Sequence, residues 1–118
     1  MERNGMRLQY SELNSGIRLI KLSGSLDFYG VNQVEVDFVR CCAGENVCVL
    51  VDMSKVNYIS SIGIPLLINS AKSIARQGGK MALLNPKKPV EDVLELTGIP
   101  LIIPIYQNLN RAISEIKK

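Results

Sequence analysis

The sequence has 118 residues, enough for one domain over residues 1–118, and 47% of them are hydrophobic, which allows a substantial core. No apolar run approaches the length of about 20 residues that a membrane span requires, and the N-terminus lacks the apolar segment of a signal peptide, so we expect a cytoplasmic protein without membrane insertion. The net charge of +3 is spread along the chain and aromatic residues are few, which argues against direct nucleic-acid binding.

The first third of the chain predicts a β-hairpin followed by a helix. Two stretches rich in strand-forming residues flank an Asn-Ser-Gly turn. Val31, Val34 and Phe38 then recur at helical spacing, and Gly44 ends the helical pattern. The predicted elements are a strand over residues 6–13, a strand over 17–22, a loop over 23–27 and a helix over 29–43.

The remainder of the chain alternates strands with helices. Residues 47–51 are apolar on both faces, as in a central parallel strand covered by helices, and Asp52 is expected to close this strand. Gly78 and Gly98 end two helical patterns. The predicted elements are a strand over residues 47–52, a helix over 62–77, a strand over 80–84, a helix that includes Val90 and Leu94, an edge strand over 101–103 and a helix that includes Leu109 and Ile116.

The resulting order of elements is β-β-α-β-α-β-α-β-α. Strands that alternate with helices require right-handed crossovers and a mostly parallel sheet. The sequence therefore predicts a single α/β domain, with a mixed but mostly parallel sheet, an N-terminal hairpin and four helices. The order of the strands within the sheet does not follow from these patterns.

The sequence contains no histidine, which excludes Ser-His-Asp and Cys-His catalysis and histidine ligation of a metal. Its three cysteines, Cys41, Cys42 and Cys48, lack the Cys-x-x-Cys spacing of zinc and redox sites, so we expect them to be small, buried structural residues. No glycine-rich phosphate-binding motif occurs. We therefore expect no enzyme, no bound metal and no cofactor, and the residues favour an interaction module.

Four polar residues are predicted to gather where strands end. Asp27 follows the second predicted strand, Asp52 closes the third, and Ser60 and Ser61 precede the second helix. In an open α/β sheet, binding sites lie outside the carboxyl ends of the strands. Local structural roles are also available, since Asp27 and the serines can cap helices and Asp52 can fix a turn at Ser54. Their predicted position on one edge favours a functional surface.

These motifs, in this order, resemble the STAS domain (sulfate transporter and anti-sigma factor antagonist), in particular free-standing bacterial anti-sigma factor antagonists. Residues 22–27, Leu-Ser-Gly-Ser-Leu-Asp, are similar to the family's strand-end motif of glycine, any residue, an aliphatic residue and aspartate. Residues 51–64 are similar to its longer signature, in which an aliphatic strand, Asp-Leu-Ser and a spacer lead to Asp, Ser, one of Ser, Thr or Ala, Gly and Leu at the start of a helix. Residues 78–80 and 93–98 also match, so the resemblance covers almost the whole chain.

The resemblance implies a phosphorylation site and a partner surface. In the family, the partner is an anti-sigma factor that is also a serine kinase of the kinase-like ATPase type, and it phosphorylates the serine after the signature aspartate; a serine phosphatase is the second implied partner. Ser61 aligns with this phosphoacceptor, and Ser60, which stands where the family has aspartate, is a rival acceptor. The implied partner-binding residues are Asp27, Asp52, Ser60, Ser61, Ile62 and Gly63.

The sequence departs from the family pattern in three places. Ser60 replaces the aspartate, Ile62 replaces a small residue, and Pro65 stands where glycine or another small residue is common. Proline disfavours helical geometry at the residue before it, here Ile64. We therefore expect the second helix to begin late or to be distorted near the serines.

Two functions remain open. The first is an anti-sigma factor antagonist that binds an anti-sigma factor kinase, is switched off by serine phosphorylation and so regulates transcription indirectly. The second is a STAS module that binds without being phosphorylated, as a scaffold or as the cytoplasmic subunit of a transport complex. The absence of the aspartate before Ser61 favours the second function.

Overall fold

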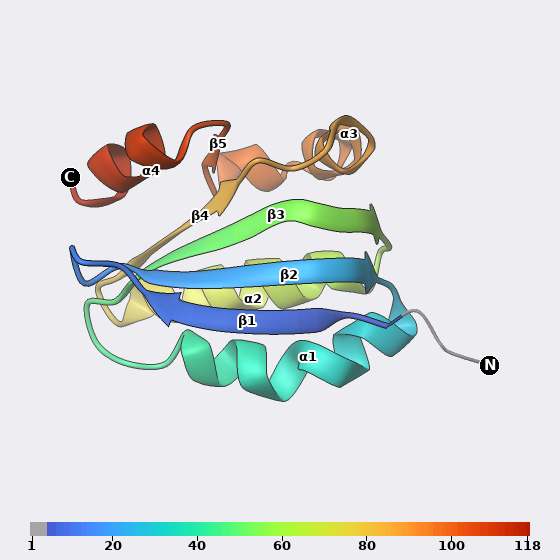
Figure 1. Ribbon diagram of the computed structural model, residues 1–118, viewed down its shortest axis with the longest axis horizontal. Coiled ribbons are helices and arrows are strands. Elements are labelled where there is room, and N and C mark those ends of the chain that lie inside the picture. The colour runs from blue at the N-terminus through green and yellow to red at the C-terminus, as the bar shows by residue number, and fades with distance from the viewer. Residues whose placement is uncertain (1–4) are drawn as a thin grey trace.

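Five strands form one mixed sheet in the computed structural model, which describes residues 5–118 (Figure 1). The strands are β1 (Arg7–Glu12), β2 (Arg18–Leu26), β3 (Cys48–Ile59), β4 (Lys80–Leu84) and β5 (Ile105–Tyr106). They lie in the sheet in chain order, with β1 antiparallel to β2 and the other neighbours parallel. The predicted hairpin and the mostly parallel sheet are confirmed.

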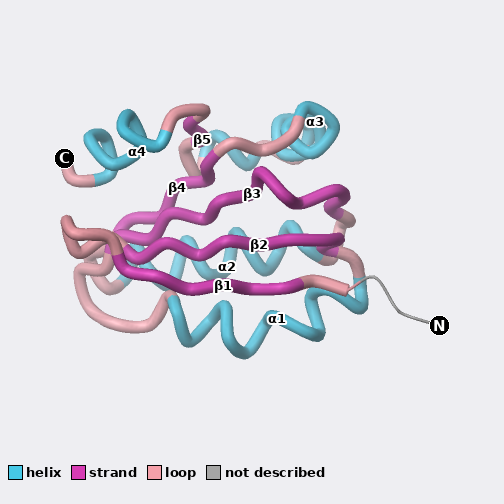
Figure 2. The backbone as a smooth tube through the Cα atoms, viewed as in Figure 1, coloured by secondary structure: helices cyan, strands magenta, loops and turns pink. Residues whose placement is uncertain are grey.

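Helices cover both faces of this sheet. They are α1 (Phe28–Cys41), α2 (Gly63–Arg76), α3 (Lys88–Leu96) and α4 (Leu109–Ile116). α1 and α2 pack on one face, α4 packs on the opposite face, and α3 lies beside β3 (Figure 2). The four predicted helices are confirmed. In the described part of the chain, no helix is long and apolar enough to cross a membrane.

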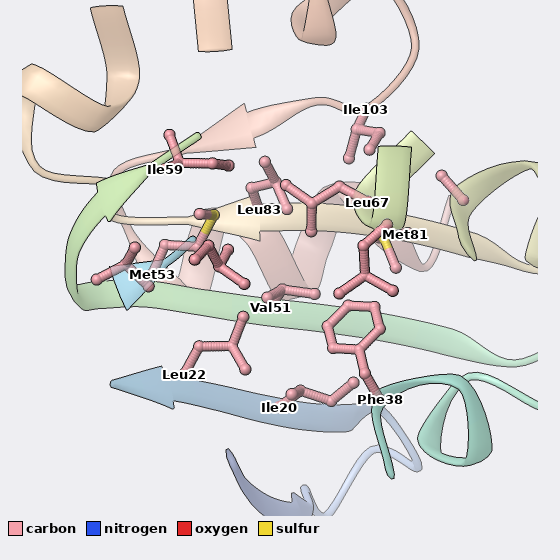
Figure 3. Close-up of a cluster of buried hydrophobic side chains, with 14 of the residues drawn as sticks. Ile20, Leu22, Phe38, Val51, Met53, Ile59, Leu67, Met81, Leu83 and Ile103 are labelled. Atoms are coloured by element: carbon pink, nitrogen blue, oxygen red, sulfur yellow. The ribbon is translucent and has the colours of Figure 1, made fainter. Parts of the chain in front are cut away.

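Successive residues of β3 divide the core between the two faces of the sheet. Val49 and Val51 belong to a cluster that also contains Phe38 of α1 and Leu67 of α2 (Figure 3). Leu50 points the other way and belongs to the cluster beneath α4. All five side chains are fully buried, so the middle of the predicted central strand is covered on both faces. The period of two along β3 is what separates the two clusters.

β2 and β3 are longer than the sequence predicted. The predicted loop over residues 23–27 is wrong, because β2 continues to Leu26 and pairs with β3 as far as Ile59. Register shifts interrupt this pairing, as β-bulges do. Gly24 lies at one of them with a φ of 117°, and a side chain there would meet the carbonyl oxygen of Gly5. Both strands therefore run past the end of β4 (Figure 1).

The predicted edge strand over residues 101–103 is also wrong. Residues Ile99–Leu101 form a 3-10 helix, and the short edge strand β5 follows it. The carbonyl oxygen of Ile99 accepts hydrogen bonds from the backbone N–H groups of Ile102 and Ile103, both at 2.8 Å. Within this apolar run only Ile99 and Ile103 are buried. Residues 99–103 therefore show the burial pattern of a helical turn, with one side buried. In a strand, alternate residues would be buried instead.

The burial of Leu67 in α2 predicts that truncating it destabilises the protein far more than truncating the exposed Leu101. Leu67→Ala should lower the free energy of unfolding by about 2–5 kcal/mol, because Leu67 is fully buried and its truncation leaves a cavity. Leu101 is 92% exposed, so Leu101→Ala should change the free energy of unfolding by less than about 0.5 kcal/mol. Urea unfolding followed by circular dichroism measures both values, and equal losses would contradict the packing of α2.

Candidate functional site

The carboxyl ends of β2 and β3 meet at one end of the sheet, where Leu26 pairs with Ile59. A helix follows each strand almost at once, with α1 beginning at Phe28 and α2 at Gly63. Both helices therefore start at this end of the sheet, on the right of Figure 1. The two connecting turns lie side by side, and they carry Asp27 and the two serines that the sequence singled out.

Asp27 caps α1. Its Oδ1 accepts a hydrogen bond of 2.9 Å from the backbone N–H of Gly30, and its own backbone is extended. This bond satisfies one of the N–H groups that a helix N-terminus leaves without a partner. The local structural role of Asp27 is thus confirmed, and its contact with a partner stays a prediction.

Ser60 ties the end of β3 to the end of β2. Its backbone N–H and its hydroxyl both donate to the carbonyl oxygen of Leu26, at 3.0 and 3.1 Å. The same hydroxyl accepts a hydrogen bond of 3.3 Å from the backbone N–H of Ile62. Ser60 is half-buried, and its hydroxyl is engaged as both donor and acceptor. A phosphoryl group on this oxygen would remove the bond that the hydroxyl donates.

Ser61, in contrast, is exposed, and within residues 5–118 its hydroxyl makes no hydrogen bond. It precedes the start of α2, whose N-cap is Ile62 and lacks a side-chain hydrogen bond. Ser61 therefore does not cap this helix, and the only hydrogen bond of a serine side chain at its N-terminus among the described residues is the one that the Ser60 hydroxyl accepts from Ile62. The first turn of α2 contains no acidic residue, so the positive end of the helix dipole near Ser61 is not offset by a carboxylate there.

α2 begins at Gly63, so the late start expected from Pro65 is not observed. Pro65 lies in the first turn, where a backbone N–H has no acceptor within the helix, and its missing N–H costs no hydrogen bond. Close packing favours Gly63, since a Cβ there would lie 3.0 Å from the carbonyl oxygen of Leu26 and 3.0 Å from Cγ1 of Ile59. The N-terminus of α2 thus packs directly on the ends of both strands.

Asp52 does not lie at this end of the sheet. The sequence predicted that it closes β3, but the strand continues to Ile59. At about 3.3 Å per residue, Asp52 lies roughly 20 Å back along the strand. Its Oδ1 accepts a hydrogen bond of 2.9 Å from the N–H of Ser54, so the predicted turn contact occurs, but inside a strand. The predicted grouping with Asp27 and Ser61 is therefore wrong, and partner contact by Asp52 stays a prediction.

A groove of about 570 Å³ lies between α1 and α2, and Ser61 is part of its lining. Buried Val31 and Leu66 contribute to its apolar surface. Exposed side chains complete it, among them Phe28 at the start of α1 and Val39 near its end. A pocket of this size and character is typical of a binding site.

Exposed apolar side chains mark the same surface, and the sequence analysis missed most of them. Phe28 is 60% exposed, Val39 51% and Ile62 44%. The rings of Phe28 and Tyr29 contact each other edge to face, with centroids 5.9 Å apart. Contiguous exposed apolar area on a small protein marks an interaction site. The aromatic pair directly after Asp27 is the signal in the sequence that could have indicated it.

Cys42 lies in the wall of the groove and is buried, whereas Cys41 and Cys48 are half-buried; all three are free thiols. Burial raises the pKa of the Cys42 thiol to about 12, nearby Cys41 also raises it, and the guanidinium of Arg18 acts in the opposite direction. The thiol is therefore neutral and unreactive at ordinary pH. All three cysteines were expected to be buried, and Cys41 and Cys48 are only half-buried. Within the described residues, no three His, Cys, Asp or Glu side chains form a metal-binding group.

The raised pKa of Cys42 predicts a loss of stability at alkaline pH. An unfolded thiol ionises near pH 9, whereas the folded thiol stays protonated up to about pH 12, so raising the pH across this window favours the unfolded chain. The free energy of unfolding should fall more steeply in the wild type than in Cys42→Ala over this range. Urea unfolding in reductant, at about pH 8 and about pH 10, measures the difference; parallel slopes would contradict burial of the thiol.

The hydrogen bonds of Ser60 predict that the two adjacent serines differ in structural importance. Ser60→Ala should lower the free energy of unfolding by about 1 kcal/mol, because it removes the hydroxyl that links Leu26 to Ile62. Ser61→Ala is the matched control and should change it by less than about 0.5 kcal/mol. Thermal and urea unfolding measure both variants. A larger loss of stability in Ser61→Ala than in Ser60→Ala would show that the hydroxyl of Ser61, and not that of Ser60, stabilises this turn.

Comparison with known proteins identifies the family. A sequence model of the STAS domain matches residues 11–112, and the chain belongs to the STAS domain family. It is similar to an anti-sigma F factor antagonist of Paenibacillus polymyxa, with 27% identity over 115 residues. That alignment covers 95% of this chain and 97% of the relative. The resemblance drawn from the sequence is confirmed.

Solved structures share the whole fold. An anti-sigma factor antagonist from Mycobacterium paratuberculosis superposes with a TM-score of 0.85 at 18% identity, covering 96% of this chain and 95% of that one. The anti-sigma factor antagonist SpoIIAA in its unphosphorylated form gives a TM-score of 0.76 at 20% identity, covering 94% and 96%. The phosphorylated form of Bacillus SpoIIAA gives 0.68 at 18% identity, covering 93% and 99%. At these identities the structures establish the fold.

Proposed function

We propose that this protein is an anti-sigma factor antagonist, which binds an anti-sigma factor with serine kinase activity and is released when that kinase phosphorylates Ser61. A serine phosphatase restores the binding form. The observation that carries the proposal is the free, exposed hydroxyl of Ser61 beside an apolar groove. The names of the relatives support it, because proteins similar to this chain over nearly their full length are anti-sigma factor antagonists.

Ser61 suits the role of phosphoacceptor better than Ser60. A kinase has to place the attacking hydroxyl in line with the terminal phosphate of ATP, so the hydroxyl must be accessible. The Ser61 side chain meets this requirement without any rearrangement. The Ser60 hydroxyl would first have to give up its hydrogen bond to the carbonyl oxygen of Leu26, and that oxygen would lose one of its donors.

A phosphate on Ser61 would be tolerated by the fold and unfavourable at the interface. It adds about −1.5 to −2 charges, which the N-terminus of α2 accommodates. SpoIIAA, which shares the fold, has been solved in phosphorylated and unphosphorylated forms, and this supports the same expectation here. At a partner surface built around Ser61, Ile62 and Phe28, the phosphate would have to be desolvated against apolar groups. A loss of about 3 kcal/mol weakens binding more than about a hundredfold.

The proposed partner surface divides into contacting and positioning residues. Ser61 and Ile62 are exposed and would touch the partner directly. Gly63 is buried, so we expect it to act by allowing α2 to pack on the strand ends. Asp27 and Ser60 are half-buried and hold the two turns in place through their hydrogen bonds.

Substitutions at the two serines test the proposal. Ser61→Asp should weaken binding of the anti-sigma factor kinase by at least about tenfold, because it places a charge where the interface accepts a hydroxyl. Ser61→Ala should bind like the wild type and incorporate no phosphate. Ser60→Ala, the matched control, should still be phosphorylated. Calorimetry measures the affinities, and intact mass after incubation with the kinase and ATP measures incorporation.

Two outcomes would contradict the proposal in different ways. Phosphate incorporation that persists in Ser61→Ala and disappears in Ser60→Ala would make Ser60 the acceptor. A kinase that binds the wild type and labels neither serine would refute the switch altogether. The second function, a scaffold or a subunit of a transport complex, would then take its place, and the serine at position 60 is the observation that favours it.

A further inference from the structure

The groove between α1 and α2 extends well beyond Ser61. Its lining reaches from Phe28 along α1 to Ala43 just beyond it, and from Ser61 just before α2 to Ser73 within it. Because an α-helix rises about 1.5 Å per residue, this corresponds to roughly 20 Å, or about four helical turns. A partner that contacts Ser61 alone would leave most of this surface open to water. The length and the parallel walls suit an extended or helical segment of a partner.

The lining is mainly apolar and carries a single charge. Val39 supplies exposed apolar surface, buried Val31 and Leu66 contribute less, and the part of the α2 wall away from Ser61 is polar. Among the described lining residues, Glu35 is the one charged side chain. Glu35 is exposed, and no lysine or arginine of residues 5–118 lines the groove. Apolar area with one carboxylate is complementary to a segment with an apolar face and one lysine or arginine.

We propose that this groove receives an amphipathic helix of the anti-sigma factor kinase, with its apolar side on Val39 and Leu66 and a basic residue opposite Glu35. The inference rests on the proposed function, since the occupant belongs to the partner that phosphorylates Ser61. The groove is continuous with that site, because Ser61 itself lines one end of it.

This arrangement explains how a single phosphate on Ser61 could release a whole helix of the partner from the groove. At its Ser61 end the groove is lined by the apolar side chains of Phe28, Ile62 and Pro65. A phosphate there would keep its hydration, so the apolar side of the helix could not be seated. Glu35 lies seven residues beyond Phe28, about 10 Å along the axis of α1, which is about one Debye length, so salt weakens the attraction between the phosphate and the partner's basic residue.

Two pairs of neighbouring residues on α1 provide a matched test. Val39 lines the groove and Val36 does not, and both are more than half exposed. Val39→Glu should weaken binding of the unphosphorylated chain to the kinase by at least about tenfold, and Val36→Glu by less than about twofold. Likewise Glu35→Lys should weaken binding by at least about fivefold, while Asp37→Lys, which reverses a charge outside the groove, should leave it within about twofold.

The measurements separate this inference from the proposed function. Calorimetry with a candidate anti-sigma factor kinase gives the affinities, and intact mass gives phosphorylation of Ser61. A wild type that is neither bound nor labelled refutes the proposed function and the occupant together. If the kinase phosphorylates the wild type but the groove variants weaken binding no more than the control variants do, the proposed groove occupant is wrong and the proposed function stands. A dimer that Val39→Glu dissociates in sedimentation, or a small molecule in the native mass spectrum, assigns the groove to another occupant and also overturns it.

Discussion

Hydrogen bonds from Ser60 to the carbonyl oxygen of Leu26 hold the last residues of β2 and β3 together, in a part of the sheet that β4 does not reach. The candidate site depends on this contact, because α1 and α2 start directly after the joined strand ends and on the same face. The two helices therefore border one groove, and the groove opens at Ser61. Gly63 permits the close approach, since a Cβ there would lie 3.0 Å from atoms of Leu26 and the neighbouring atoms would have to shift.

The sequence predicted the helices and the central strand well, because helical spacing and apolar runs report directly which side chains are buried. It failed on strand length for a physical reason. Asp52 forms the hydrogen bond to Ser54 that ends many strands, yet here the bond lies at a register shift inside β3. Whether such a residue ends a strand depends on pairing with β2, a distant segment. Local sequence therefore could not distinguish a turn from a bulge.

The candidate site was predictable in position and not in detail. Two adjacent serines before a helix are equivalent in a sequence, and only the contact with Leu26 shows that Ser60 is engaged while Ser61 is free. The groove was not predictable at all. Val39 and Val36 are both exposed valines on one helix, and what distinguishes them is the position of α2, which follows from the sheet and not from the residues nearby.

Serine at position 60, in place of the family's aspartate, has two opposite consequences: it reduces charge repulsion in the proposed phosphorylated form, and it removes a charge that a kinase could recognise. A carboxylate beside a phosphate on Ser61 would repel it, and a neutral hydroxyl that is already bonded to Leu26 does not, so the proposed phosphorylated form is electrostatically less strained here than in the family pattern. The same change removes a charged feature that a kinase could recognise. Recognition then has to come from other parts of the surface. The apolar part of the groove can supply buried area, and the carboxylate of Glu35 can supply one charge that fixes the register of the partner.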